Sequence, residues 1–534
     1  MRVDGKVRQS IVQHVGVADS LEQELQLREL AEVTIAKLEA DASPNLSLLT
    51  PEQVAGSGKR KPARPRCPAP EPEAVKLADV EEEARVVEGI GDVFGALYRQ
   101  LGFDRILEGP AGSVLEATVL ARAAQPESKH RTQKTLAIDF DVHIPLDRIY
   151  RMMDGLYRAR ERVQDRVFEA TVTSLPEQRL DLCFFDVTTL YFESVEEDDL
   201  RAFGYSKDQK FHQVQVVLAL ATTSHGLPVG YKLFRGSTAD VSTLMQCVEA
   251  WRERIPIDRV VFVGDRAMMS EANLSALEAV SAQYILGASL KKLAKPLQGQ
   301  VLEQAGYRLA DLEGDVVWTR EFELGPSRRL IASYSSRRAK KDASDRNRIL
   351  EKLRTKIGKT QKGALKRLVS NRGYLKYVEA EGSATASIDE AKVARDAVWD
   401  GMFGVVTNCK DWDAHAVLAR YRKLWTVEEA FRISKHDLRM RPIFHYLPRR
   451  IEAHIAICFL SYALLRHAQH RLRLAGHTIS TEALRDELAR VQASLLRHKR
   501  SGALYRVPSR MSELARAVYD AFGIERPSSP SLVA

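Results

Sequence analysis

The sequence has few cysteines, and none of them belongs to a recognisable metal or disulfide motif. There are five in 534 residues, at Cys67, Cys183, Cys247, Cys409 and Cys458, and no two form a CxxC pair. This spacing argues against a zinc site and against a disulfide-rich secreted domain. Because two of the cysteines stand inside apolar runs, we expect free, mostly buried thiols in a reducing cytosol.

Long hydrophobic runs are also missing. The most apolar stretch, IAICFLSYALL at 455–465, is too short to span a bilayer and is flanked by His454 and Arg466. The first residues, MRVDGKVRQSIVQHVG, lack the apolar core of a signal peptide. We therefore expect a soluble intracellular protein without a membrane partner.

The charge balance is only modestly basic. The chain carries 80 basic and 71 acidic residues, a net charge of +9, and 45% of its residues are hydrophobic. This is ordinary globular composition, with enough length for several domains. The excess suits a nucleic-acid-binding protein, and it suits an ordinary basic protein equally well.

The pattern of polar and apolar residues changes along the chain. Residues 18–42 predict a helix, 56–74 a proline-rich linker, and 76–175 a region that is helical throughout. Strand patterns start near residue 180. They predict an antiparallel meander followed by alternating helices and strands, over 181–192, 211–222, 228–236, 241–254 (helix), 258–265, 270–281 (helix) and 283–289.

Residues 291–398 interrupt this pattern and predict an insertion. It contains two hairpin strands (315–324 and 328–336), a basic helical stretch (340–368) and a further strand (373–380). A buried strand at 401–408, long helices at 412–439 and 449–472, and a basic helical tail after 478 complete the prediction.

Two carboxylates occupy apolar strands, where a charge is costly unless it is compensated. Asp186 stands in the middle of CFFDVTTLYF (183–192), and Asp265 ends RVVFVGD. The carboxyl ends of strands are where α/β folds build their sites. Taken singly, a strand-end Asp more often caps the next turn.

A third acid comes from YRKLWTVEEAFRISK. Tyr421, Glu428 and Lys435 are spaced by seven, which places them on one stripe of a continuous helix with only about 20° of drift. Arg432 lies four residues beyond Glu428 and near the same stripe. A lone Glu with such neighbours is usually a surface ion pair, and Glu429 points elsewhere, as a solvated residue would.

Capping and surface ion pairs are less convincing explanations when three acids occur around one sheet. Converging carboxylates repel each other unless a cation neutralises them. Mg²⁺ prefers oxygen ligands and is held by one or two carboxylates together with substrate phosphates. Two such ions, roughly 3.5–4 Å apart, can clamp the attacking and leaving oxygens of a phosphoryl transfer. The sequence therefore predicts a divalent-metal site.

The order strand-Asp, strand-Asp, insertion, helix-Glu resembles the DDE transposases of bacterial insertion sequences, in the group with a Tyr–Arg–Glu–Lys signature and a β-rich insertion. The resemblance rests on DVTTLYFES, VVFVGDRAM and the run from Tyr421 to Leu465, and covers about 180–470. It implies an α/β fold: a ribonuclease-H-like mixed sheet flanked by helices, with helical N- and C-terminal regions.

By this resemblance, Asp186, Asp265 and Glu428 match the catalytic, metal-binding triad, with two Mg²⁺ ions that Mn²⁺ can replace. The implied DNA contacts are Tyr421, Arg422, Arg432, Lys435 and Arg266. The expected signature Arg position holds Leu424, and Arg422 and Arg432 are the candidates to replace it.

The implied activity is cleavage at transposon ends followed by strand transfer into target DNA. The partners are double-stranded DNA and a second copy of the chain, in the bacterial cytoplasm with the nucleoid. The expected domains are an N-terminal DNA-binding region (1–175), a core in two parts (176–290 and 399–475), the insertion (291–398) and a C-terminal region (476–534).

Three other functions fit parts of the pattern. FFDVTTL begins like the nucleophile strand of a haloacid-dehalogenase-like phosphatase, but Thr188 stands where that chemistry needs a second acid. A structure-specific nuclease of the same fold and a catalytically inactive DNA-binding protein remain alternatives. The large insertion favours the transposase over the nuclease.

Overall fold

The computed structural model describes two short N-terminal segments and most of the chain from residue 75 onward. The described residues are 2–3, 6–7, 75–194, 196–204, 212–238, 240–251, 260–312, 314–358, 376–381 and 385–533. The chain divides into two compact units, Met1–Val75 and Lys76–Ala534. In the first, β1 (Arg2–Val3) pairs antiparallel with β2 (Lys6–Val7). The helix predicted over 18–42 and the linker over 56–74 lie outside the described residues.

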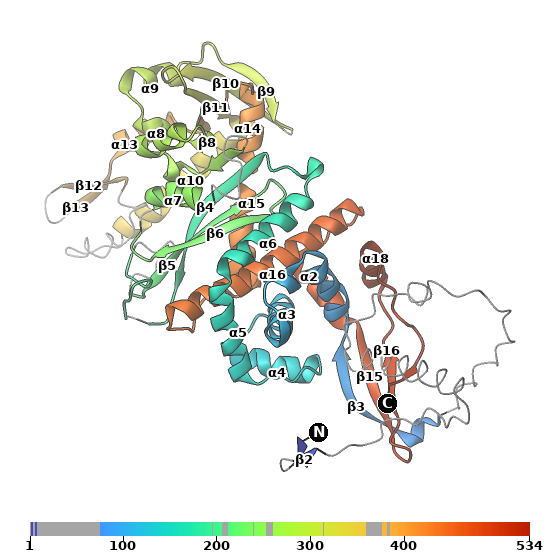
Figure 1. Cartoon of the computed structure of the whole chain (residues 1–534). Helices are drawn as coiled ribbons and strands as arrows, with labels where there is room; N and C mark the ends of the chain where they lie inside the picture. The colour runs from blue at the N-terminus through green and yellow to red at the C-terminus, as the bar shows by residue number, and fades with distance from the viewer. Residues whose placement is uncertain are drawn as a thin grey trace. The chain divides into compact units, whose positions relative to one another are not determined.

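The second unit is built on a nine-stranded sheet in the order β6-β5-β4-β7-β8-β14-β11-β10-β9 (Figure 1). Its first five strands are β4 (Leu182–Tyr191), β5 (Gln215–Thr222), β6 (Pro228–Arg235), β7 (Val261–Gly264) and β8 (Gln283–Gly287). β4, β5 and β6 form the predicted antiparallel meander, while β7 and β8 run parallel to β4. The predicted mixed α/β sheet is confirmed.

Burial on both faces explains why β5 is apolar from Val216 to Ala221. Val216, Leu218 and Leu220 belong to the core on one face, and Val217 and Ala219 belong to the core on the other. A strand covered on both sides has no solvent-facing positions, so polar alternation is lost. The sheet is thus the middle layer between two sets of helices.

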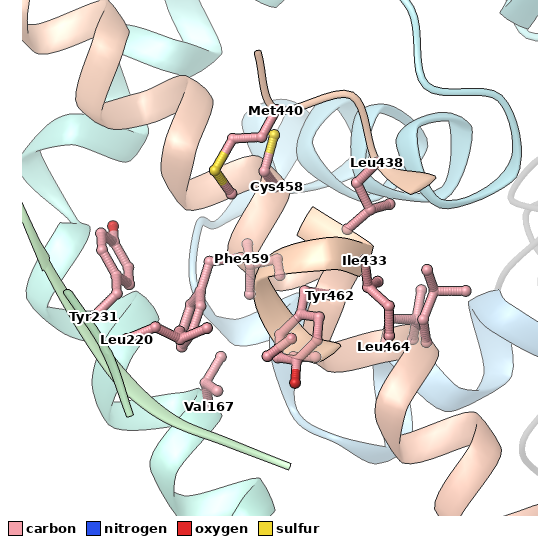
Figure 2. Close-up of a cluster of buried hydrophobic side chains, with 14 of the residues drawn as sticks. Val167, Leu220, Tyr231, Ile433, Leu438, Met440, Cys458, Phe459, Tyr462 and Leu464 are labelled. Atoms are coloured by element: carbon pink, nitrogen blue, oxygen red, sulfur yellow. The ribbon is translucent and has the colours of Figure 1, made fainter. Parts of the chain in front are cut away.

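One face is covered by helices from the N-terminal half and by a long helix near the C-terminus. α6 (Arg160–Thr173) and α16 (Pro448–Leu474) pack on the sheet, and α3 (Gly109–Ala124) and α5 (Leu146–Arg158) pack on α16. Figure 2 shows Phe459 of α16 pointing toward Leu220 and Tyr231 of the sheet, and the rings of Phe459 and Tyr231 lie 4.7 Å apart. The predicted helix over 449–472 is confirmed as α16. On the opposite face lie α7 (Asp240–Trp251) and α8 (Glu271–Ala279).

The strands predicted for the insertion continue the core sheet. β14 (Met402–Thr407) pairs with β8 on one side and with β11 (Arg329–Ser335) on the other. β10 (Asp315–Glu323) then pairs with β11 as the predicted hairpin, and β9 (Arg308–Leu312) forms the edge. The rest comprises α9 (Lys295–Leu302), α10 (Ser336–Gly358), β12 (Val378–Glu381), β13 (Thr385–Ile388) and α13 (Glu390–Ala397). The sheet continues from β8 through β14 into β11, β10 and β9 without a break, so it marks no boundary at 291 or 398. The domain limits at these positions stay a prediction.

The region 76–175 is not helical throughout, and the tail after 478 is not purely helical. β3 (Val80–Val87) joins a second sheet in the order β17-β16-β15-β3, with β15 (Gln492–His498), β16 (Leu504–Pro508) and β17 (Ser531–Leu532). The Glu-rich β3 looked helical because its strand partner is far away in the chain, and pairing overrides a weak local preference. The tail also contains α17 (Thr481–Arg490) and α18 (Glu513–Phe522).

The helix predicted over 412–439 is broken. It consists of α14 (Ala414–Arg422), α15 (Trp425–Arg432) and the π-helical turn η8 (Ile433–Asp437). Between α14 and α15 the backbone N–H groups bond three residues back, and the Thr426 hydroxyl donates to the carbonyl of Lys423. These local bonds tighten the chain without any Gly or Pro, so the break could not be predicted from residue type.

Shorter helical segments complete the second unit: α2 (Ala96–Gln100), α4 (Lys129–Asp139), η1 (Leu77–Asp79), η2 (Ile90–Gly95), η3 (Phe103–Arg105), η4 (Pro176–Gln178), η6 (Arg266–Met268) and η7 (Leu290–Lys292). Among the described helices, none is long and apolar enough to cross a membrane. Cys183, Cys247, Cys409 and Cys458 are free and buried, as expected; Cys67 lies outside the described residues.

Arg466 of α16 ties the helix layer to the sheet. Its side chain is 4% exposed and donates to the carbonyls of His225 and Gly226, at 2.9 and 3.2 Å, and to the carboxylate of Glu429 at 3.2 Å. Gly226 has a φ of +74°, and a Cβ there would meet the guanidinium at 2.0 Å. The β5–β6 turn and α15 are therefore both fastened to α16 through one buried cation.

We expect Arg466→Met to lower the free energy of unfolding by about 3 kcal/mol or more, because it leaves two carbonyls without this donor and Glu429 without its buried cation. Urea denaturation followed by circular dichroism measures the change. Arg473→Met is the matched control, since Arg473 is an exposed residue of the same helix. Equal stability of the two variants would show that the Arg466 contacts contribute nothing.

Candidate active site

Asp186 and Asp265 lie at the same level on neighbouring strands. β4 and β7 are parallel, and Phe185 pairs with Gly264. Each aspartate is the next residue along its strand direction, so the two lie side by side across a strand spacing of roughly 4.8 Å. The predicted proximity of the two strand carboxylates is consistent with this register.

Glu428 comes from the helix that covers the face to which Asp186 points. Phe185 and Val187 belong to the core on the opposite face, so Asp186 between them faces the layer of α15. α15 packs against β4 and β5 through buried residues such as Val427 and Phe431. Glu428, on the same helix, is exposed.

Backbone contacts hold the two aspartates in place. Asp265 follows β7 directly, and its Oδ1 accepts hydrogen bonds from the backbone N–H groups of Ala267 and Met268, at 2.8 and 3.3 Å. This is the capping role that a strand-end Asp commonly has. Oδ1 of Asp186 accepts from the N–H of Val187 at 2.7 Å. Both carboxylates are thus oriented by the chain next to them.

A cavity of about 930 Å³ brings several predicted residues together. Asp265, Arg266, Tyr421, Arg422 and Glu428 line it. Asp186, Arg432 and Lys435 do not belong to its lining. Because the helix is broken, Tyr421 lies in α14, Glu428 in α15 and Lys435 in η8, so the predicted single stripe does not exist as such.

Tyr421 feels the charge of two carboxylates that line the cavity, Asp265 and Glu428. Burial raises the pKa of its hydroxyl, and the negative charge of Asp265 raises it further, with a smaller effect from Glu428. Its ring packs on Phe403 with centroids 5.1 Å apart. Gly287, at the end of β8, makes room for it: a Cβ there would stand 2.5 Å from the Tyr421 hydroxyl oxygen and 3.0 Å from the backbone nitrogen of Arg266.

Two of the predicted phosphate-binding arginines are already paired with acids. Arg422 binds Asp315 at 2.6 Å and donates to the carbonyl of Leu312 at 2.9 Å. Arg432 pairs with Asp437 at 3.3 Å and with Glu429 at 3.9 Å. Glu429 is not simply solvated as predicted, because it also binds the buried Arg466.

Five side chains of the cavity wall were not among the predicted site residues: Lys291, Arg337, Arg338, Lys341 and Trp425. Three of them stand on the first turns of α10, within RRAKK at 337–341. That run was visible as a cluster of charge, but only the fold brings it into the same cavity wall as Glu428. Trp425 is 57% exposed, which is high for so large a side chain.

The donor atoms suit a hard divalent cation. Within the described part of the chain, no group of three or more His, Cys, Asp or Glu is close enough together to hold an ion by itself. Mg²⁺, however, takes only one or two protein carboxylates and completes its shell with water and substrate phosphates. The neighbouring carboxylates of Asp186 and Asp265 are a donor set of that size.

Comparison with known proteins gives one family. The family model described as "Transposase DDE domain" matches residues 177–464. The match starts just before β4 and ends within α16, so it contains the strands, the cavity and all the predicted site residues. No curated protein matches the chain.

The close approach of Gly287 to Tyr421 can be tested by a double-mutant cycle. We expect Gly287→Ala to lower the free energy of unfolding by about 1–3 kcal/mol through overpacking. The same substitution should cost less in a Tyr421→Phe background, because the nearest atom is then absent. Urea denaturation of the four proteins measures this.

Gly299→Ala is the control, since a Cβ at this helical position meets nothing within 4 Å. A cost of Gly287→Ala that is unchanged by Tyr421→Phe would contradict the described contact.

Proposed function

The chain belongs to the transposase DDE domain family, and on that premise we propose that it cuts DNA strands at transposon ends and joins them to target DNA. Membership itself gives a transposase-type function and a polynucleotidyl-transferase or nuclease class of enzyme. The observation that carries the finer proposal is the register of β4 and β7, which sets Asp186 beside Asp265 under the helix of Glu428.

Asp186, Asp265 and Glu428 are the proposed catalytic residues. Enzymes of this family generally use divalent metal ions, and here the ions proposed are two Mg²⁺, replaceable by Mn²⁺, held by these three carboxylates. When bound, such ions activate the attacking hydroxyl or water and neutralise charge on the phosphate. The carboxylates themselves have no covalent role; they fix the position of the reacting groups.

Tyr421 has a proposed role as a neutral hydrogen-bond donor. A tyrosine phenol is protonated at neutral pH, and burial and Asp265 raise the pKa of this one further. A protonated hydroxyl can donate to a phosphate oxygen without adding negative charge to the site. The Phe403 contact limits the movement of the ring.

DNA is the partner that the family implies. Contacts are proposed for Tyr421, Arg266, Arg422, Arg432 and Lys435, of which the first three line the cavity. Arg422 and Arg432 would first have to leave Asp315 and Asp437. DNA binding by residues 1–175, assembly as a homodimer and residence with the nucleoid are further parts of this proposal.

We expect Asp186→Asn, Asp265→Asn and Glu428→Gln each to lower strand cleavage by about 10³-fold or more, in line with the loss of one key electrostatic group. DNA affinity should change little. The measurement uses labelled duplexes that carry the inverted repeats flanking the gene, with cleavage and joining followed on denaturing gels.

Glu429→Gln is the matched control, because it removes the neighbouring carboxylate on the same helix, which binds Arg466 instead of lining the cavity. Its cleavage should persist while its stability falls. Near-normal cleavage by any of the three test variants would remove that residue from the triad, and cutting without joining would favour a nuclease.

Metal binding should depend on the two strand aspartates. We expect isothermal titration calorimetry to detect Mn²⁺ binding to the wild-type protein and a loss of at least about tenfold in affinity for the Asp186→Asn/Asp265→Asn variant. Calorimetry does not require turnover, so it tests the site separately from the reaction. Equal Mn²⁺ affinity of the two proteins would place the ions elsewhere.

A further inference from the structure

Acids and cations are mixed along the cavity wall. Its cations are Arg266, Lys291, Arg337, Arg338, Lys341 and Arg422, and its carboxylates are Asp265, Asp315, Asp342, Asp345 and Glu428. A second cavity of about 290 Å³ shares Arg266, Lys291 and Arg338 with the first, together with Asp342 and Asp345. A cation of this wall is available to an anionic ligand only where a carboxylate does not already hold it.

Some of these cations serve the fold. Lys291 is paired with Asp396, which also binds Lys376 and the Tyr377 hydroxyl. The pKa of Asp396 is held far below its usual range by these donors, although burial opposes them. Lys291 thus fastens the segment after β8 to α13, just as Arg422 fastens α14 to β10 through Asp315.

Arg338 is held differently. Its only ion pair within the described residues is a loose one, 3.7 Å from Asp342 one turn along α10, and its side chain is 49% exposed. Its guanidinium lies over the ring of Phe403, 4.9 Å from the centroid, and the same ring packs on Tyr421. Phe403 therefore places the charge of Arg338 near the Tyr421 hydroxyl without neutralising it.

Arg266 approaches Tyr421 from the other strand end. It follows Asp265 directly, is exposed, and has no carboxylate partner among the described residues. Its backbone lies against Gly287, which also faces the Tyr421 hydroxyl. Both Arg266 and Arg338 are near enough to lower the pKa of Tyr421 against the larger effect of burial.

We infer that Arg266 and Arg338 together bind a backbone phosphate of the DNA strand beside Tyr421. Leu424, at the position where an arginine was expected, is 8% exposed and belongs to the core, so this chain draws the cation from η6 and α10 instead. Guanidinium groups suit this task because they donate two parallel hydrogen bonds to phosphate. The inference rests on the proposed action on DNA and names the residues that position the strand.

The test compares DNA binding by single variants in an Asp186→Asn background, so that turnover does not interfere. We expect Arg338→Ala and Arg266→Ala each to reduce the slope of log K against log salt by roughly one, the loss of one phosphate contact. Arg338→Lys should keep the slope. The control is Arg348→Ala, which removes an exposed α10 arginine whose partner is Asp345 and which lies outside the cavity lining.

A scan with single neutral methylphosphonates locates the phosphate. One substitution should weaken wild-type binding several-fold, weaken each single arginine variant less, and have no effect on Arg266→Ala/Arg338→Ala, which lacks both contacts. An Arg338→Ala slope equal to that of the wild type overturns the inference. So does an Arg266→Ala/Arg338→Ala variant that remains as sensitive as the wild type to every methylphosphonate. A wild-type protein that binds DNA but never cuts it would contradict the proposed function and still leave this binding test decisive.

Discussion

The parallel pairing of β4 with β7 is the constraint on which the site depends. It fixes Asp186 and Asp265 at one level of the sheet, although the two residues are far apart along the chain. A shift of one residue in this register would turn one carboxylate to the opposite face, into the core of Phe185 and Val187. The cost of burying an unpaired charge there helps to keep the register correct.

The helices on the face of the sheet to which Asp186 points form part of the cavity wall. α15 lies on β4 and β5 through buried apolar side chains, and Glu429 fastens it to Arg466 of α16. Two adjacent glutamates on one helix thus do different things, since Glu429 secures the helix and Glu428 stays exposed on the cavity wall. Because the helix is broken before α15, Tyr421 and Glu428 lie on different helices, and both still line the cavity.

Local pattern was enough for the sheet and for its carboxylates. The apolar runs of β4, β5 and β7 leave few alternatives to buried strands, and an acid in such a run stands out, as Asp186 and Asp265 did. The predictions that were wrong or missing depended on contacts with other parts of the chain, which a local pattern does not show. β3 forms a strand only by pairing with β15. The turn at Lys423 arises from hydrogen bonds of the backbone and of the Thr426 hydroxyl. Arg338 becomes part of the site only when the fold brings α10 into the cavity wall.

The sheet that joins β3 to β15 has a consequence for how the chain matures. Glu82 on β3 bonds Ser494 on β15, 412 positions away. Ribosomes add about 5–20 residues per second, so β3 emerges roughly 20–80 s before its partner exists. During that interval its edge is unpaired, and a strand edge left open is a place where other chains can add. The protein therefore completes this sheet only after nearly the whole chain has been synthesised, and a prematurely terminated chain leaves β3 without its strand.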